Sequence, residues 1–356
     1  MLDIDFIAGS NSDPESTSSY DAIALRFKSA EDTEQKVVVI DAGFSDIGND
    51  VVNHLADHYG TNKVDLMIST HPDKDHLNGL ITAIQQLDVK ELLIHQPDQY
   101  KDDLSEFTNL ENLNTLIAFA IEQDVVITDP YTGLNRFDGR IRILGPTEDY
   151  YKDLLDAQLD PTVRAQFASR AAPTGLAAVI ASLASLTGTV IDALPIETLG
   201  NGGITHPRNN SSVITLLSFE GKKYMFTGDA GIPALTAAAD EYESLYVAFR
   251  QSPLTFFQSP HHGSKRNVGT DILDRILGPK HAPHDEDVSG YIHAAKASKK
   301  HPSPKVTNAL MRRGVKKERL SVTNGSHKWH HSNSPSREGW SGIDPYPYLN
   351  EDDDES

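Results

Sequence analysis

Residues Thr70–Gly79 read T-H-P-D-K-D-H-L-N-G. Four of these side chains are potential metal ligands: His71, Asp73, Asp75 and His76. The segment follows an apolar run at 64–69 (VDLMIS) and precedes apolar residues at helical spacing over about 76–87, so we expect a loop between a buried strand and a helix. Divalent metal ions need several convergent nitrogen and oxygen ligands. A polar turn that only caps a helix explains this concentration of imidazoles and carboxylates less well.

Three further strand ends carry side chains of the same kinds. Asp41 ends the β-branched run 36–40 (KVVVI), Asp229 follows the second strand of an expected hairpin at 212–226, and His261 and His262 follow a third strand. Each residue alone has an ordinary explanation, such as a helix cap, a turn or a buried histidine. Since α/β folds assemble sites from the ends of several strands, we expect these side chains to meet.

The order of strands and helices predicts an α/β fold in layers. The alternating segment 22–28 (AIALRFK) is expected to be a half-exposed strand, whereas the continuous apolar run at 36–40 predicts a strand buried on both faces. Residues about 148–200 are expected to form a helical insert. One domain is expected over 1–332, followed by a flexible acidic tail over 333–356 that ends in EDDDES.

The composition is that of a globular protein of 356 residues with a net charge of −19. It has no cysteine, which excludes disulfides, thiolate zinc sites and cysteine nucleophiles. With no signal-peptide pattern and no apolar run long enough to cross a bilayer, we expect a cytoplasmic protein without a membrane span. Residues 296–319 hold nine Lys or Arg against one Glu. That run is either a solvated helical face or a basic rim for a phosphate-bearing substrate.

The motif order D-A-G, H-P-D-K-D-H, T-G-D and H-H-G-S resembles the metallo-β-lactamase superfamily. It looks most similar to the soluble hydrolase domain of the ComEC-type competence proteins, whose loop is H-x-D-x-D-H. The resemblance spans about Ile4 to Ser264. It implies a four-layer αββα sandwich with a two-metal site at one edge.

The resemblance also implies roles for single residues. His71 and Asp73 would bind the first metal, Asp75 and His76 the second, and Asp229 would bridge them. One of His261 and His262 would complete the second site, and the choice between them stays open. Asp75 and Asp229 are the expected catalytic carboxylates. Asp41 would orient the loop, Asn209 or Asn210 stands where the superfamily has another histidine, His206 is a candidate substitute, and Ser264, Lys265 and Arg266 would contact substrate.

The carboxylate-rich site suits two divalent ions, Zn²⁺ or Mn²⁺, with Mg²⁺ as a further candidate. Such a pair of ions generates a bridging hydroxide at neutral pH and binds both the attacking and the leaving oxygen of a displacement reaction. We therefore expect a phosphodiesterase or nuclease acting on nucleic acid or nucleotides. The alternatives are a lactone or small-ester hydrolase of the same fold, and a non-catalytic partner-binding module of a defence or competence-type system. The insert at 148–200 is where a protein partner or a substrate lid is expected.

Overall fold

The computed structural model describes residues 1–9, 15–160, 162, 196–281, 288–340 and 342–354, and two seven-stranded sheets form its centre. In spatial order the first sheet contains β16 (Lys328–Ser332), β1 (Leu2–Phe6), β2 (Ala22–Phe27), β3 (Lys36–Ala42), β5 (Leu66–Ile68), β7 (Glu91–Leu93) and β8 (Val126–Thr128). The second contains β15 (Val315–Val322), β14 (Val288–Ile292), β13 (Phe256–Gln258), β12 (Lys222–Phe226), β11 (Ile214–Phe219), β10 (Ile141–Gly145) and β9 (Asn135–Arg136). The short strands β4 (Lys63–Val64) and β6 (Asp88–Val89) pair separately.

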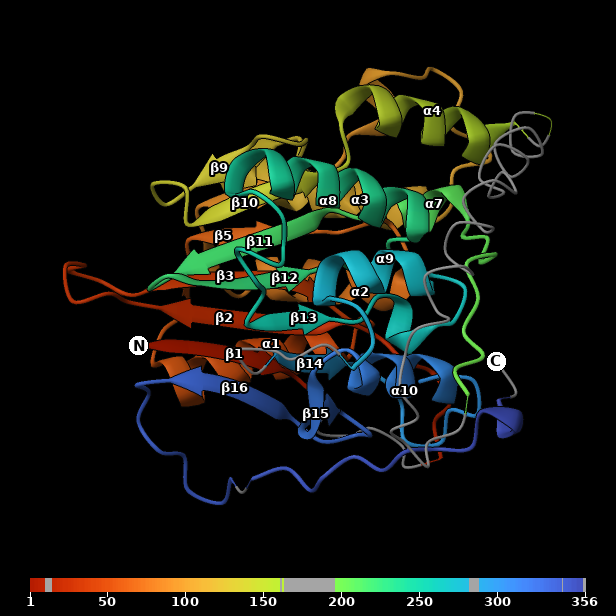
Figure 1. Ribbon diagram of the computed structural model, residues 1–356. Helices are drawn as coiled ribbons and strands as arrows, with labels where there is room; N and C mark the ends of the chain where they lie inside the picture. Colours follow the sequence, from red (N-terminus) through yellow and green to blue (C-terminus); the bar gives the residue numbers. More distant parts are fainter. Residues whose placement is uncertain (10–14, 161, 163–195, 282–287, 341, 355–356) are drawn as a thin grey trace.

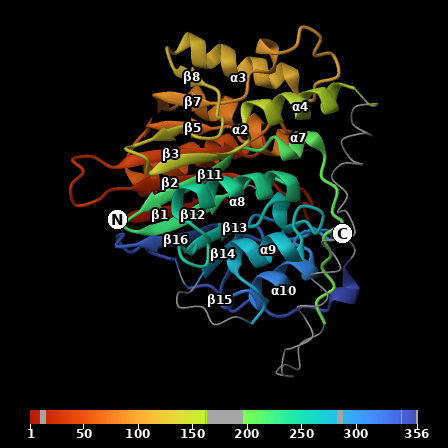
Figure 2. The same ribbon diagram turned by 45° about the horizontal axis from the view of Figure 1, so that its top comes forward.

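Helices lie on the outer face of each sheet (Figures 1 and 2). The first sheet is covered by α1 (Ile47–His54), its π-helical continuation η1 (Leu55–Tyr59), α2 (Lys74–Ile84) and α3 (Leu110–Glu122). The second is covered by α8 (Ile232–Tyr246), α9 (Thr270–Leu277) and α10 (Pro304–Arg312). The remaining helices are short or peripheral: η2 (Pro97–Gln99), α4 (Glu148–Leu159), α7 (Pro207–Asn210), η4 (His261–Gly263) and η5 (Glu351–Asp353). The expected four-layer αββα sandwich is confirmed.

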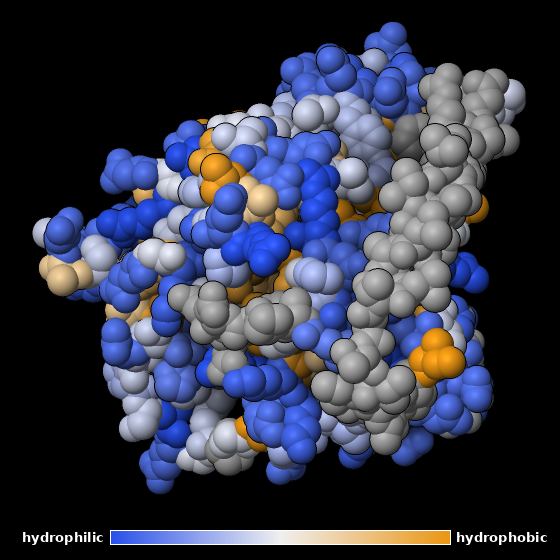
Figure 3. Space-filling view, viewed as in Figure 1, coloured by the Kyte–Doolittle hydropathy of each residue, from blue (hydrophilic) through white to orange (hydrophobic). Residues whose placement is uncertain are grey.

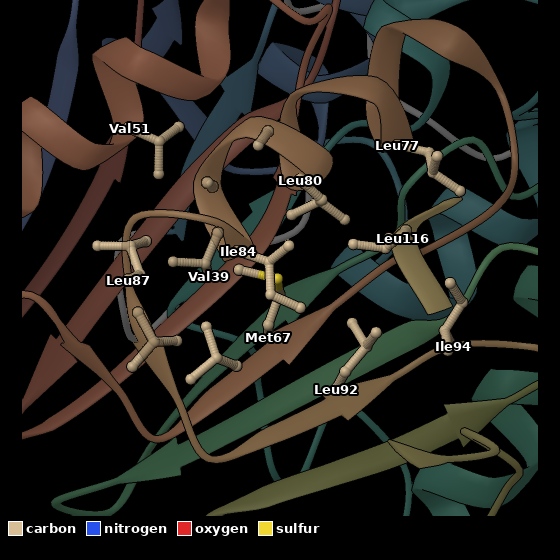
Figure 4. Packing of buried hydrophobic residues seen from close by; sticks show 14 of the residues in the cluster. Val39, Val51, Met67, Leu77, Leu80, Ile84, Leu87, Leu92, Ile94 and Leu116 are labelled. Atoms are coloured by element: carbon tan, nitrogen blue, oxygen red, sulfur yellow. The ribbon is translucent and has the colours of Figure 1, made fainter. Parts of the chain in front are cut away.

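Three separate apolar layers hold these elements together. Figure 4 shows part of the first, where Val39 and Met67 of the sheet contact Leu80 of α2. A second layer lies between the two sheets, with Val38 and Phe256 among its members. The third lies between the second sheet and its helices. The outer surface is mostly hydrophilic on the face shown in Figure 3.

Two strand predictions had different outcomes. The prediction for residues 36–40 is confirmed, because Val39 faces the helices while Val38 and Ile40 face the other sheet. The prediction that 22–28 is half-exposed is wrong, since every residue of β2 is buried. Its polar member, Arg26, is buried in an ion pair with Asp3 of β1. An alternating pattern does not show whether the polar residues of the strand face water or form buried ion pairs.

The C-terminal residues also differ from the expectation of a flexible tail. Arg337 forms an ion pair with the buried Asp5, and its guanidinium lies 4.1 Å from the centre of the Trp329 ring. Farther on, the buried Glu351 pairs with Arg312 of α10. The described part of 333–354 is therefore fixed to the domain by specific charge pairs. The expected helical insert at 148–200 is represented by α4, while most of it lies outside the described residues.

No helix of the described residues is both long enough and apolar enough to cross a membrane.

Parallel strands bring the expected site residues to one edge of the sandwich. β3 and β5 are parallel neighbours in the first sheet, and β12 and β13 are parallel neighbours in the second. Their carboxyl ends are followed by the His71 loop, by Asp229 and by the His261–His262 turn. Two loops of the first sheet thus face two loops of the second.

Gly79 allows α2 to lie directly against the end of β3. A Cβ atom at this position would lie 1.8 Å from the carbonyl oxygen of Ala42, and the Gly79 N–H donates to Gly43 O over 2.8 Å. No side chain fits there without moving the helix. Because α2 carries Asp75 and His76 in its first turn, this contact also positions the site.

We predict that Gly79→Ala lowers the free energy of unfolding by at least about 2 kcal/mol, because an added methyl overpacks a filled contact. Gly202→Ala is the matched control, since nothing lies within 4 Å of a Cβ there. Urea unfolding of the two variants and wild type measures the difference. Equal stability of the two variants would contradict the proposed close approach.

His95 is a packing residue. Its ring stacks on Tyr151 with centroids 4.1 Å apart, and its Nε2 donates to Ser211 O over 3.2 Å. Burial lowers the pKa of His95 to about 3, from an ordinary value of 6.5. The folded protein therefore keeps the neutral imidazole at pH values where the unfolded chain binds a proton.

We predict that this difference costs stability as the pH falls from the unfolded pKa toward the folded one. Between about pH 7.5 and pH 5, His95 alone lowers the free energy of unfolding by up to about 2 kcal/mol. His95→Phe keeps the ring stack but cannot titrate. Its stability relative to wild type should therefore improve on going to the lower pH in urea unfolding, and a constant difference would argue against the proposed burial of a neutral imidazole.

Candidate metal centre

The loop after β5 places its four candidate ligands in two ways. His71 and Asp73 belong to the extended loop, whereas Asp75 and His76 belong to the first turn of α2. Asp73 is the N-cap residue of that helix and has extended φ and ψ angles. Because the backbone changes from extended to helical here, His71 and Asp73 face one candidate metal position, and Asp75 and His76 face the other.

One group of side chains, called here the Asp75 group, gathers around Asp75. His262 Nε2 lies 3.3 Å from Asp75 Oδ2, and His76 Nε2 lies 3.9 Å from the same oxygen. The ligand atoms of these three residues all lie within 4.8 Å of one another. His76 Nε2 also lies 3.3 Å from Asp229 Oδ1, which adds a second carboxylate to the group.

A second group, called here the Asp73 group, gathers around the other oxygen of Asp229. His71 Nε2 lies 3.6 Å from Asp229 Oδ2 and 3.7 Å from Asp73 Oδ2. His261 Nε2 is also 3.6 Å from Asp229 Oδ2. Asp229 therefore stands between the two groups and turns one oxygen toward each. The structure places His262 with the Asp75 group and His261 with the Asp73 group.

The backbone of the H-H-G turn explains how neighbouring histidines reach different groups. His261 and His262 both have left-handed φ angles, 48° and 56°, and Gly263 follows at 80°. Left-handed backbone is uncommon for non-glycine residues and tends to occur where function requires it. Here it turns two consecutive side chains toward the same edge.

All four histidines are held by their Nδ1 atoms. His76 Nδ1 lies 2.7 Å from Asp41 Oδ2, and His262 Nδ1 lies 2.8 Å from His293 O. His71 Nδ1 is 3.0 Å from Thr70 Oγ1, and His261 Nδ1 is 3.0 Å from Asn267 Oδ1. An acceptor at Nδ1 fixes the proton there and leaves the Nε2 lone pair for a metal ion.

The residues fit two divalent cations by a direct observation. Three of the inward-facing atoms are buried and have no hydrogen-bond partner among the described residues: His71 Nε2, His76 Nε2 and Asp229 Oδ1. Buried polar atoms are nearly always paired, so a cluster of unpaired lone pairs indicates a bound cation. Four imidazoles and three carboxylates provide enough ligands for two ions.

Electrostatics favour the ionised carboxylates at this edge. Burial would raise the pKa of Asp229, but His261 and His76 beside it hold that pKa well below its ordinary value. Burial lowers the pKa of His262, yet the hydrogen bond to Asp75 and the charge of Asp21 raise it to about 9. The site therefore attracts positive charge, whether that charge is a proton or a metal ion.

Asp41 lies behind the cluster rather than in it. Its carboxylate accepts hydrogen bonds from the backbone N–H and the hydroxyl of Thr70, at 2.8 and 2.6 Å, as well as from His76. It thereby fixes both the start of the loop and one imidazole.

The three residues expected near the missing histidine have separate places. Asn209 Nδ2 lies 3.3 Å from Asp229 Oδ2, so its side chain lies against the Asp73 group. Asn210 Oδ1 accepts from Gly231 N and has a structural role. His206 caps α7, where its Nδ1 accepts from Arg208 N, and it belongs to neither histidine–carboxylate group found among the described residues. His261, rather than His206, lies beside Asp229 Oδ2 with His71.

The expected substrate residues also separate. Ser264 is buried, and its hydroxyl accepts from Arg266 N. Lys265 Nζ lies 3.3 Å from Asp354 Oδ2 of the C-terminal segment. The Arg266 side chain is exposed. Of the three, Arg266 alone offers an exposed side chain.

The basic run at 296–319 does not form one rim. Arg312 and Arg313 are buried and paired with Glu351 and Glu197. Lys316 and Lys317 lie at the start of β15, whereas the end of that strand pairs beside Ile292, near the site. His301, within the run, does lie at the site, with its ring 5.6 Å from that of His261.

Several residues outside the expected site support the cluster. Asp21 is buried beneath His262, 3.6 Å from its Nδ1, and accepts from Gln258 Nε2 over 2.7 Å. Burial raises the pKa of Asp21 to about 6. Asn267 also donates to the backbone oxygen of Asp229. These polar residues directly precede or follow the motif strands, which was the only available signal.

We predict that His261→Ala and His262→Ala each reduce the bound metal from two ions to about one per chain, because each removes a ligand from a different group. Metal analysis of purified protein and calorimetric titration of the chelated protein measure this change. His281→Ala, which alters an exposed histidine, should keep both ions. Two ions of unchanged affinity in His261→Ala would exclude that residue as a ligand.

No family model and no curated protein matches the sequence. Among solved structures, the chain is similar to a candidate metallo-beta-lactamase from Thermotoga maritima, at 12% identity over 64% of this chain and 78% of that one, with a TM-score of 0.33. It is also similar to the hydrolase AbOPH of the beta-lactamase superfamily, at 12% identity over 64% and 70%, with a TM-score of 0.31. A metallo-beta-lactamase from Hirschia baltica shares 12% identity over 72% and 84%, with a TM-score of 0.30. The architecture of this chain follows from its own strand order and layers.

Proposed function

We propose that the protein is a two-metal hydrolase of the metallo-β-lactamase superfamily that cleaves phosphodiester bonds in nucleotides or nucleic acid. The observation that carries the proposal is the convergence of four histidine Nε2 atoms on Asp229, Asp75 and Asp73. The motif order H-x-D-x-D-H, T-G-D and H-H-G-S supports the superfamily and its ComEC-type branch.

Each metal ion has its own ligands in this proposal. His71, Asp73 and His261 would hold the first, Asp75, His76 and His262 would hold the second, and Asp229 would contribute an oxygen to each. Two divalent ions supply Lewis acidity and lower the pKa of water. The protein orients the ligands through Asp41, Asn267 and the His293 carbonyl. The least buried side chains of the cluster are His261, Asp75 and Asp73, at 33, 27 and 16% exposure, so substrate approaches past them.

The ligand chemistry supports a phosphodiester over a neutral ester. Three carboxylates would supply oxygen ligands to the metal pair, which suits oxygen-preferring ions such as Mn²⁺. Such a pair neutralises the oxygens of a transferring phosphoryl group. The dispersed basic run and the net charge of −19 favour a nucleotide or a short strand end over a long duplex.

We predict that purified protein hydrolyses bis(p-nitrophenyl) phosphate with Mn²⁺, and more slowly with Mg²⁺ or Zn²⁺. The double variant Asp75→Ala/His76→Ala should lose the second ion and at least about 100-fold in rate. Lys63→Ala, which alters an exposed side chain at β4, is the control. Activity that survives the double variant would rule out this site. Hydrolysis of p-nitrophenyl acetate or a lactone without phosphodiester cleavage would favour the small-ester alternative.

A further inference from the structure

Arg208 lies at the rim of the Asp73 group on a fixed backbone. Its N–H donates to His206 Nδ1 over 3.2 Å, and its carbonyl oxygen accepts from Ser211 Oγ over 2.6 Å. The next residue is Asn209, whose side chain contacts Asp229. The backbone of Arg208 is therefore tied to the cluster by the same short turn, α7.

The guanidinium of Arg208 is also fixed, but only on part of its edge. Its Nε lies 2.5 Å from Asp73 Oδ1, and Nη1 donates to Thr108 Oγ1 over 3.0 Å. The side chain is 26% exposed. Among the described residues, Nη2 donates to no protein acceptor. This nitrogen of the guanidinium can therefore donate to a bound molecule.

Asp73 connects this cation to the first metal position. One carboxylate oxygen, Oδ1, faces Arg208, while Oδ2 faces His71 Nε2 at 3.7 Å. Asp73 can therefore serve the metal with one oxygen and retain Arg208 with the other. The partly exposed guanidinium thus lies directly beside a candidate metal ligand.

Other cations near the site are less suitable. Lys265 is paired with Asp354, and Arg312 and Arg313 are buried in ion pairs with Glu351 and Glu197. Among the described residues, the exposed Arg266 forms no hydrogen bond or ion pair with a candidate metal-binding side chain. Arg208 combines contact with a candidate ligand and a partly exposed side chain.

We propose that Arg208 binds the anionic group of the substrate, a non-bridging oxygen of a phosphodiester, and so selects charged over neutral substrates. This inference rests on the proposed two-metal function and specifies its substrate class. A planar guanidinium matches the geometry of phosphate oxygens, and charge-assisted hydrogen bonds of this kind are strong. No residue in the H-P-D-K-D-H or H-H-G-S motifs supplies such a group.

The test compares Arg208→Gln and Arg208→Lys with wild type, all with their metal content measured. Arg208→Gln should weaken the binding of inorganic phosphate by about 10- to 100-fold in calorimetric titration. Its kcat/KM for bis(p-nitrophenyl) phosphate should fall by a similar factor, while that for p-nitrophenyl acetate changes less than about 2-fold. Arg208→Lys, which keeps the charge without the fork, should recover part of the phosphate affinity. Arg250→Gln, an exposed arginine before β13, is the matched control and should behave as wild type.

Three results would overturn the proposal. An equal loss for the charged and neutral substrates, or the loss of a metal ion in Arg208→Gln, would mean that Arg208 acts only by positioning Asp73. Unchanged phosphate affinity would remove Arg208 from substrate binding. If wild type cleaves no phosphodiester at all, the proposed function fails, but phosphate binding to wild type and Arg208→Gln still decides the role of Arg208.

Discussion

The contact of Asp229 with two sets of histidines is the interaction on which the rest of the site depends. Oδ1 of Asp229 faces His76 and Oδ2 faces His71 and His261. Asp229 follows a strand of the second sheet, whereas His71 and His76 belong to the first. A buried carboxylate is costly unless several partners or a cation compensate it. The site can therefore form only where the two sheets meet in the correct register.

The surrounding structure maintains that register through hydrogen bonds rather than through apolar packing alone. Asp229 N donates to Ser212 Oγ, and Asn267 donates to Asp229 O. Across the interface, Gln258 of the second sheet donates to Asp21, which precedes β2 of the first. These contacts hold the ligands before any ion binds, so less ordering remains to be done on metal binding.

Much of the fold and the ligand set could be predicted from the sequence, because strand ends and ligand-type residues coincide there. The loop at 71–76, Asp229 and the histidine pair meet in space as expected. The division of labour between His261 and His262 could not be predicted, since it depends on left-handed backbone at two non-glycine residues. Arg208 lacks a motif and is identified by its contact with Asp73. The buried strand β2 and the fixed C-terminal segment depend on ion pairs between residues distant in sequence, such as Asp5 and Arg337.

Anomalous diffraction from crystals grown with Mn²⁺ tests the central claim most directly. The account predicts two peaks on either side of the Asp229 carboxylate. One peak should be bound by His71, Asp73 and His261, and the other by Asp75, His76 and His262. A single peak, or a peak at His71 and Asp73 without His261 among its ligands, would contradict the assignment of one histidine of the pair to each metal.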